Sequence, residues 1–178
     1  VDKGALYLAK QGIKMKVAIG DFDSIQPNDL EKIKQYAQEI IQLNPEKDQS
    51  DSQVAIELAS QRGYTHGLIL GGLGRRFDHS YVNLQLLLQS DISLTLQDQN
   101  NKIVALPEGK HTLKRDNYRY LSVFSQGDGI ISINGVKYPL ENYAMKKNNL
   151  IGLSNEIIES EAHLELKNCS FLIIQSKD

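Results

Sequence analysis

The chain has 178 residues, of which 40% are hydrophobic and 24% charged, a composition typical of a folded globular protein. The formal net charge of −2 gives no electrostatic footprint for nucleic acid or an anionic membrane, and no apolar stretch is long enough to span a bilayer. The first residues do not resemble a signal peptide, and the single cysteine, Cys169, cannot form an internal disulfide. We therefore expect a cytoplasmic protein that binds neither nucleic acid nor membrane.

The first hundred residues alternate between helical and extended patterns. In chain order, they predict a helix ending at Gly12, a strand at 16–19, helices at 28–43 and 51–63, a buried strand at 67–70, a helix at 81–89, and strands at 92–96 and 102–106. Asn28 and Glu31 have the spacing of a capping box. Strands that alternate with helices indicate a mainly parallel sheet with flanking helices. Because this region begins inside a helix, we expect its first strand to be missing from this sequence.

After Pro107 the pattern changes to short, alternating or β-branched segments, and it predicts no helix. In chain order, the predicted strands are "NYRYLSVFS", "GIISIN", "VKYPL", "AHLEL" and "SFLIIQS". Such a series indicates an antiparallel β-sandwich or a small barrel. We therefore divide the chain into an α/β domain at 1–107 and a β-sandwich domain at 108–178. Cys169 lies in the strand-like pattern "KNCSFLII", so we expect a buried structural thiol.

The segment "GDFDS" at 20–24 directly follows the strand predicted at 16–19. Side chains alternate along an extended chain, so Asp21 and Asp23 are predicted to face one way and Phe22 the other. Two carboxylates so close repel unless a cation or protons neutralise them, and hard oxygen ligands suit Mg²⁺. An ordinary loop in which one aspartate caps a turn also explains the pentapeptide.

The segment "EKDQSDSQ" at 46–53 leads into the helix predicted at 51–63. Asp48, Ser50 and Asp51 are all suitable for a helix N-terminus, where the helix dipole favours carboxylates. The functional alternative assigns Lys47 to a phosphate, and Asp51 to a metal or to the acceptance of a proton. The spacing alone leaves both readings open.

The segment "GGLGRRFDHS" follows the strand predicted at 67–70. Its glycines let the backbone approach a ligand closely, and its arginines precede a helix N-terminus, which favours anions. The segment matches neither the G-x-x-x-x-G-K-[ST] nor the G-x-G-x-x-G pattern. The residues that together indicate a phosphate site are Gly71, Gly72, Gly74, Arg75 and Arg76.

All three polar segments fall where the ends of strands are expected, and ligands of open α/β sheets bind at the carboxyl ends of the strands. Together the segments supply carboxylates for Mg²⁺, and glycine N–H groups and arginines for phosphates. This combination indicates nucleotide-dependent phosphoryl or pyrophosphoryl transfer, in which catalysis is mostly positioning and charge neutralisation. The acceptor does not follow from composition or spacing.

The motifs "VDKGA", "GDFDS", "KDQSD" and "GGLGRRFDH", in this order and at this spacing, resemble those of the thiamine pyrophosphokinase family, bacterial type. "NGVKYPLEN" followed by "GLSNE" extends the resemblance over nearly the whole chain. The resemblance implies an ATP-dependent thiamine diphosphokinase that transfers pyrophosphate from ATP to the hydroxyl of thiamine and releases AMP. It also implies Mg²⁺ and a homodimer, with each active site shared between the α/β domain of one subunit and the sandwich of the other.

Site residues are implied by the same resemblance, motif by motif. The acidic group at Mg²⁺ and the phosphates would be Asp2, Asp21, Asp23 and Asp51. The residues implied to bind nucleotide or substrate in the α/β domain are Lys47, Ser50, Gly72, Gly74, Arg75, Arg76 and Asp78. Lys47 and Asp48 would lie beside the nucleotide phosphates or the thiamine hydroxyl. Arg76 would face the phosphates, and Asp78 would brace the loop.

The sandwich contributes the implied thiamine site. In "GVKYPL", Tyr138 lies where many family members have tryptophan, and its ring is implied to stack on the thiamine pyrimidine. Ser154 and Asn155 of "GLSNE" are implied to hydrogen-bond that ring. Without the resemblance, Tyr138 is an ordinary strand aromatic and the other two residues form an ordinary turn.

The catalytic residues implied are Asp48, Asp51 and Arg76. The thiamine hydroxyl would attack the β-phosphorus of ATP in line, Mg²⁺ would bridge phosphates and carboxylates, and Arg76 would offset the developing charge. Asp51 would orient or deprotonate the hydroxyl, or would only bind the metal. Two alternatives are another Mg²⁺-dependent nucleotidyl or phosphoryl transferase with a different acceptor, and a non-catalytic nucleotide-binding module.

Overall fold

The computed structural model describes residues 1–74 and 76–178. The chain packs into two compact units, Val1–Tyr64 and Thr65–Asp178. Within the described residues, the first unit contains three helices and two strands, and the second contains one helix and nine strands. None of the described helices is both long enough and apolar enough to cross a membrane.

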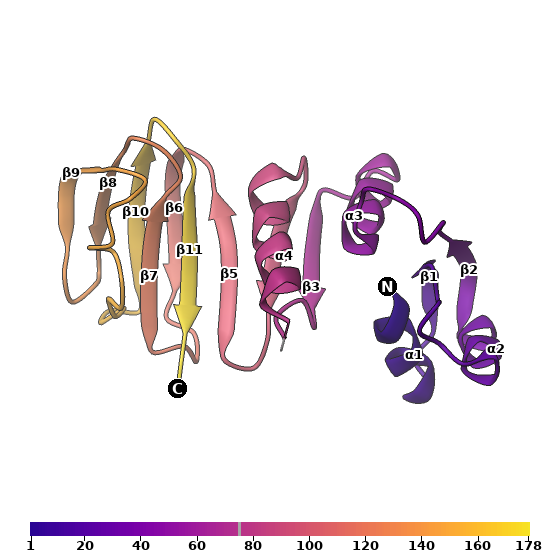
Figure 1. Ribbon diagram of the computed structural model, residues 1–178. Helices are drawn as coiled ribbons and strands as arrows, with labels where there is room; N and C mark the ends of the chain where they lie inside the picture. The colour runs from indigo at the N-terminus through magenta and orange to yellow at the C-terminus, as the bar shows by residue number, and fades with distance from the viewer. Residues whose placement is uncertain (75) are drawn as a thin grey trace. The chain divides into compact units, whose positions relative to one another are not determined.

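The N-terminal unit is an α/β structure built on two parallel strands (Figure 1). In chain order, it contains α1 (Asp2–Lys10), β1 (Met15–Gly20), α2 (Pro27–Tyr36), β2 (Ala37–Gln42) and α3 (Asp51–Gln61). Helix α1 packs against both α2 and β1. The small side chains Ala5 and Ala9 and the larger Ile33 are fully buried between these elements. This core fixes the start of α1 and the end of β1 relative to each other.

The segment 28–43, predicted to be a single helix, is helical only as far as Tyr36 and then continues as strand β2. Its isoleucines fit both a helical and an extended pattern, because a short apolar run does not distinguish the two. Pairing with β1 decides between them: Ile40 lies opposite Ala18, and Ile41 lies opposite Ile19.

The predicted capping box at the start of α2 is also wrong. The helix begins at Pro27, with Gln26 as the N-cap residue and no side-chain hydrogen bond to the helix end. Proline is well suited to the first position of a helix, because the N–H that it lacks would have no partner there. Asn28 therefore lies inside the first turn and does not cap it.

The second unit combines a strand–helix–strand segment with a two-layer antiparallel structure. In chain order, it contains β3 (His66–Leu70), α4 (Phe77–Gln89), β4 (Ser93–Gln97), β5 (Asn101–Leu106), β6 (Gly109–Lys114), β7 (Tyr120–Ser125), β8 (Gly129–Asn134), β9 (Leu140–Met145), β10 (Glu161–Lys167) and β11 (Phe171–Ser176). One sheet has the order β3-β4-β5-β11-β7, and the other has the order β6-β10-β8-β9. Figure 1 shows β11 between β5 and β7.

The predicted fold class is confirmed. The parallel pairs β1–β2 and β3–β4 alternate with helices, whereas every strand pair after β4 is antiparallel within the described residues. Residues 65–107 nevertheless pack with the sandwich, because β3, β4 and β5 belong to the same sheet as β7 and β11. The division into functional domains at 107/108 stays a prediction.

The sandwich core lies between the inner faces of the two sheets. Its fully buried side chains come from both sheets, among them Leu121 and Phe171 from one and Ile131 and Leu166 from the other. Alternation along each strand places these residues on one face, as expected for a sheet with one covered face.

Three smaller predictions differ from the structure. The predicted strand at 136–140 is irregular up to Leu140, where β9 begins. Cys169 lies in the turn before β11 and is partly buried. Strand β3 alternates between exposed and half-buried residues and is not a fully buried strand.

Truncation of a core leucine should destabilise the protein strongly. We expect Leu166→Ala, at 1% exposure, to lower the free energy of unfolding by about 2–5 kcal/mol, because it removes buried apolar contacts and leaves a cavity. The matched control is Leu150→Ala, at 71% exposure, which should change it by less than about 0.5 kcal/mol. Urea unfolding measures both, and equal effects of the two variants would contradict the described core.

Candidate functional site

Three carboxylates from three different segments meet in the N-terminal unit. Asp2 lies at the start of α1, Asp21 follows β1, and Asp51 begins α3. One carboxylate oxygen of each residue lies within 4.8 Å of the others, and all three residues are half-buried. We call Asp2, Asp21 and Asp51 the three-carboxylate group. Gly20 permits this approach, because a Cβ at that position would collide with the Asp2 carboxylate.

The chain turns directly after β1 and does not continue as an extended segment. Phe22 has a left-handed backbone, with a φ of 57°, and its side chain is buried. Its N–H donates to Asp2 Oδ1 at 3.3 Å, and the N–H of Asp23 donates to Asp21 Oδ1 at 3.1 Å. The predicted alternation of side chains is therefore wrong. Asp21 both caps the turn and belongs to the three-carboxylate group, whereas Asp23 is exposed and outside it.

The carboxylates of Asp2 and Asp51 are electrostatically coupled. Burial and, as the next largest cause, the neighbouring Asp51 carboxylate together raise the pKa of Asp2 to about 6. For Asp51, burial also acts to raise the pKa, but contact with Asp2 and Lys47 outweighs burial and lowers it. The pair therefore holds a proton on the Asp2 side at pH values below about 6, unless a cation replaces it.

Lys47 neutralises part of this charge. Its Nζ lies 2.6 Å from Asp51 Oδ1, with exposed side-chain fractions of 19% and 15%, and the contact raises the pKa of Lys47. Asp51 Oδ1 is buried, and its ion pair with Lys47 offsets only part of the negative charge of the three-carboxylate group. Three carboxylates gathered in this way fit a hard cation such as Mg²⁺.

The start of α3 explains how Asp51 is held. Ser50 is the N-cap residue, and its Oγ accepts a hydrogen bond from the N–H of Gln53 at 3.2 Å. Asp51 then occupies the first turn, where the helix dipole favours a carboxylate. The helix-start reading and the functional reading of this segment are thus compatible. Asp48 is exposed and lies outside the three-carboxylate group.

The glycine-rich loop before α4 is held by two buried polar residues that the sequence did not single out. Asn83 Nδ2 donates to the carbonyl of Gly72 at 2.8 Å, and Ser80 Oγ accepts from the N–H of Gly74 at 3.1 Å. A Cβ on Gly72 would meet Asn83 and core side chains, so internal packing already requires glycine there. The available signal was two polar residues three apart, one just before and one within the helix predicted at 81–89, which alone does not indicate a loop contact.

Arg76 and Asp78 form an exposed ion pair at the start of α4. The guanidinium Nη2 lies 2.5 Å from one carboxylate oxygen of Asp78, and Nε lies 3.2 Å from the other. This contact lowers the pKa of Asp78 and raises that of Arg76. The pair agrees with a bracing role for Asp78. Arg75 lies outside the described residues.

A cavity of about 250 Å³ opens in the sandwich, and Tyr138 and Asn155 are among its lining residues. Its walls are mostly apolar side chains of both sheets, namely Val123, Ile131, Ile133, Leu140 and Met145, together with the loop at 151–153. Ligand pockets usually measure about 300–1,000 Å³, so this cavity suits one ring rather than a whole cofactor. Ser154 is exposed beside it, with a left-handed φ of 56°.

Both halves of the chain match models of one protein family. The model described as "Thiamin pyrophosphokinase, catalytic domain" matches residues 1–126, and the model described as "Thiamin pyrophosphokinase, vitamin B1 binding domain" matches residues 110–175. The chain belongs to the thiamin pyrophosphokinase family. The predicted family, its ATP-dependent thiamine diphosphokinase activity and the enzyme class EC 2.7.6.2 are thereby confirmed.

Individual relatives agree with this assignment. The thiamine pyrophosphokinase of Bacillus subtilis is 33% identical over 184 residues, which cover 100% of this chain and 86% of the relative. The crystal structure of the B. subtilis enzyme matches with a TM-score of 0.91 at 31% identity, over 99% of this chain and 86% of that one. The crystal structure of the thiamin pyrophosphokinase from Geobacillus thermodenitrificans matches with a TM-score of 0.89 at 27% identity, over 99% of this chain and 84% of that one.

The raised pKa of Asp2 predicts an unusual pH dependence of stability. In metal-free protein, the Asp2 carboxyl has a pKa of about 6 in the folded state and 3.8 in the unfolded state, so the folded state binds its proton more tightly. Its contribution to the free energy of unfolding is therefore fully present below pH 3.8. This contribution is lost as the pH rises through 6. We expect the stability advantage of the wild type over Asp2→Asn to shrink between pH 4.5 and pH 7. Urea unfolding with a chelator measures this, and an advantage that grows with pH would contradict it.

Proposed function

We propose that the three-carboxylate group binds Mg²⁺ for the transfer of pyrophosphate from ATP to thiamine. The observation that carries this proposal is the approach of the Asp2, Asp21 and Asp51 carboxylate oxygens to within 4.8 Å of one another, with Lys47 offsetting the charge of Asp51 alone. Bound Mg²⁺ would supply positive charge beside the phosphates of ATP. The same observation disfavours a site for binding alone, since three carboxylates without a cation would repel phosphate.

In the proposed reaction, the thiamine hydroxyl oxygen forms a bond to the β-phosphorus of ATP. The bond from that phosphorus to the oxygen of AMP breaks, and the hydroxyl proton leaves to a base or to water. We assign Asp51 to the metal rather than to proton transfer, because its lowered pKa and its contact with Lys47 make it a weak base. Asp48, which is exposed, remains the proposed catalytic carboxylate near the hydroxyl.

Two parts of the chain are each proposed to bind phosphate: Lys47 in the first unit, and the loop residues Gly72, Gly74 and Arg76 in the second. Gly72 and Gly74 offer a backbone held by Asn83 and Ser80, and Arg76 offsets charge while Asp78 orients its guanidinium. Ser50 supports this site by capping α3. Arg75 and Asp23 keep their proposed roles at the phosphates and the metal on the resemblance alone.

Thiamine is proposed to place one ring in the sandwich cavity, against Tyr138 and beside Ser154. The cavity's apolar walls and its size support this assignment. We further propose a cytoplasmic homodimer with active sites shared between subunits, and functional domains at 1–107 and 108–178. The vitamin B1 binding model, which begins at residue 110, supports the proposed start of the second functional domain.

A product assay tests the function. Purified protein with thiamine, ATP and Mg²⁺ should release one AMP for each thiamine diphosphate formed, both followed by chromatography. A chelator should stop the reaction, and excess Mg²⁺ should restore it. ATP consumption that does not depend on thiamine would favour a transferase with another acceptor, and ATP binding without consumption would favour the non-catalytic module.

Substitution of single aspartates tests which of them bind the metal. We expect Asp21→Asn to lower kcat by more than about 100-fold, because it removes a ligand oxygen and a negative charge from the proposed cation site. Asp23→Asn, outside the three-carboxylate group, should lower it by about 10–100-fold, as neighbours of metal ligands do. The exposed Asp91→Asn is the control and should be unaffected. A near-normal rate for Asp21→Asn would remove that residue from the site.

A further inference from the structure

The side chain of Asn155 is almost entirely committed to protein backbone. Its Oδ1 accepts the N–H of Tyr138 at 3.0 Å and that of Glu156 at 2.9 Å, and its Nδ2 donates to the carbonyl of Tyr138 at 2.8 Å. These contacts fill both acceptor positions of the amide and one of its two N–H donors. The amide thereby pairs with both backbone groups of Tyr138, as a neighbouring strand would.

We propose that Asn155 is a positioning residue, which holds the backbone of Tyr138 at the rim of the sandwich cavity and does not itself recognise the substrate. The inference rests on the proposed function, because it concerns how the same cavity receives thiamine. It revises the implied role of Asn155 as a hydrogen-bonding partner of the thiamine ring. The reason is that only one N–H of the amide remains for a ligand.

The backbone of Asn155 is fixed from the inner side by strand β7. Asn155 and Leu121 exchange two backbone hydrogen bonds, at 2.7 and 2.9 Å, and Val123 N–H donates to the carbonyl of Gly152 at 2.9 Å. Ser122, at 4% exposure, accepts the N–H of Ser154 with its hydroxyl at 3.0 Å. The segment 152–155 is thus an extension of the rigid sheet, and Asn155 transmits this rigidity to Tyr138.

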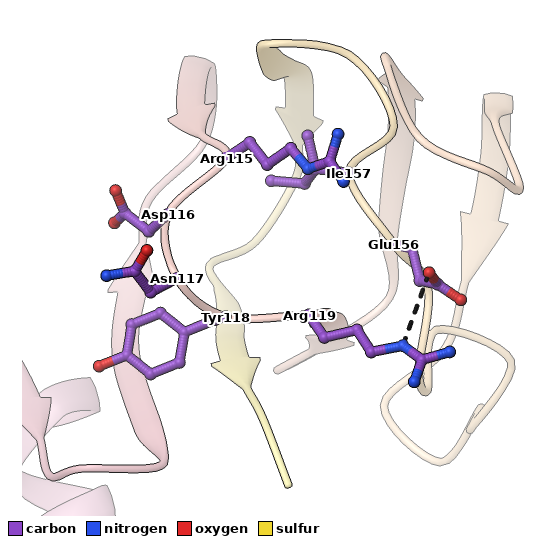
Figure 2. Close-up of a pocket in the computed structure, with 7 residues that line it drawn as sticks. All are labelled: Arg115, Asp116, Asn117, Tyr118, Arg119, Glu156 and Ile157. Carbon is purple, nitrogen blue, oxygen red and sulfur yellow. Dashed lines mark ion pairs between the residues drawn. The ribbon is translucent and has the colours of Figure 1, made fainter.

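Charged side chains form a second set of contacts beside Asn155 and Tyr138. Glu156 forms ion pairs with Lys137 at 3.4 Å and with Arg119 at 3.9 Å. Figure 2 shows Arg119 directed toward Glu156, and both residues belong to the lining of a hollow of about 240 Å³ formed by residues 115–119 and 156–157. These charges contribute little energy alone. The N–H of Lys137 also donates to the carbonyl of Glu156 at 2.9 Å, which fixes the residue before Tyr138, whereas the Asn155 amide holds the backbone of Tyr138 itself.

The ring of Tyr138 depends on this restraint because little else holds it. The residue is 61% exposed, and Lys137 Nζ lies 5.5 Å from the ring centre. A stacking ring that is not packed in a core must be ordered through its backbone, and otherwise the ligand supplies the ordering free energy on binding. Loss of the Asn155 amide should therefore weaken thiamine binding without any loss of a thiamine contact.

A single-tryptophan reporter gives a binding test that does not need catalysis. The chain contains no tryptophan, so Tyr138→Trp places the only one at the cavity rim. We expect thiamine to change its fluorescence, and Asn155→Ala in this background to weaken thiamine binding by about 10–100-fold, the effect of losing two to three hydrogen bonds. Asn155→Asp keeps the acceptor oxygen and loses the donor. In the same background, its affinity for thiamine should lie between that of Tyr138→Trp alone and that of Tyr138→Trp with Asn155→Ala.

A double-mutant cycle on the KM for thiamine distinguishes positioning from direct contact. If Asn155 acts through Tyr138, then Asn155→Ala should raise KM in the wild type but change it less than about twofold in Tyr138→Ala. Independent effects that multiply would overturn the proposal, as would a fall in kcat or a rise in the KM for ATP. The exposed Asn134→Ala is the matched control and should change none of these values. Thermal unfolding identifies any variant that misfolds, and Asn155→Asp then replaces Asn155→Ala in the cycle.

These experiments distinguish a failure of the proposed thiamine site from a failure of the positioning role of Asn155. If the wild type forms no thiamine diphosphate and Tyr138→Trp does not respond to thiamine, then the cavity is not a thiamine site and both proposals fail. If the wild type is active and the reporter responds, but the effects of the two substitutions multiply, then Asn155 contacts thiamine directly and only the positioning role fails.

Discussion

The repulsion among three carboxylates is the constraint on which the N-terminal unit depends. Near a protein surface, two like charges about 4 Å apart repel by roughly 4 kcal/mol, and Asp2, Asp21 and Asp51 bring oxygens within 4.8 Å of one another. A fold that is only marginally stable retains such a group when something offsets the charge. Lys47 offsets part of it at Asp51. Burial and, after it, the Asp51 carboxylate raise the pKa of Asp2, which marks a place for a proton or a cation.

Local backbone features impose this convergence. Gly20 leaves room for Asp2, the left-handed Phe22 ends β1 in a turn, and Ser50 starts α3 so that Asp51 occupies its first turn. The buried ring of Phe22 compensates for its unfavourable backbone, because packing in the core holds a conformation that an exposed phenylalanine would leave. Each carboxylate is therefore held by the element that precedes or follows it, so the charges cannot separate unless a helix or strand moves.

The sequence predicted the composition of the site better than its geometry. Aspartate, lysine and glycine clusters at strand ends are visible because they depend on residue type and on local periodicity. The turn at Phe22 was missed, since alternation assumes an extended chain and buried side chains rarely adopt positive φ. Strand β2 was missed because pairing with β1, some twenty residues earlier, outweighed a helical stripe. Asn83 and Ser80 support the glycine loop through contacts that no spacing rule encodes.

Asn155 illustrates why motif position and physical role can differ. A motif marks a residue whose loss impairs function, but it does not distinguish contact with the substrate from support of a residue that makes contact. The hydrogen-bond inventory makes this distinction, because an amide has four positions and three are already used by Tyr138 and Glu156. Asp51 differs from Asn155, because its carboxylate lies beside those of Asp2 and Asp21 and Lys47 offsets only part of their charge. Charge that is not compensated within a group of carboxylates indicates a cation that is still to bind, whereas the used hydrogen-bonding positions of Asn155 indicate a structural task already performed.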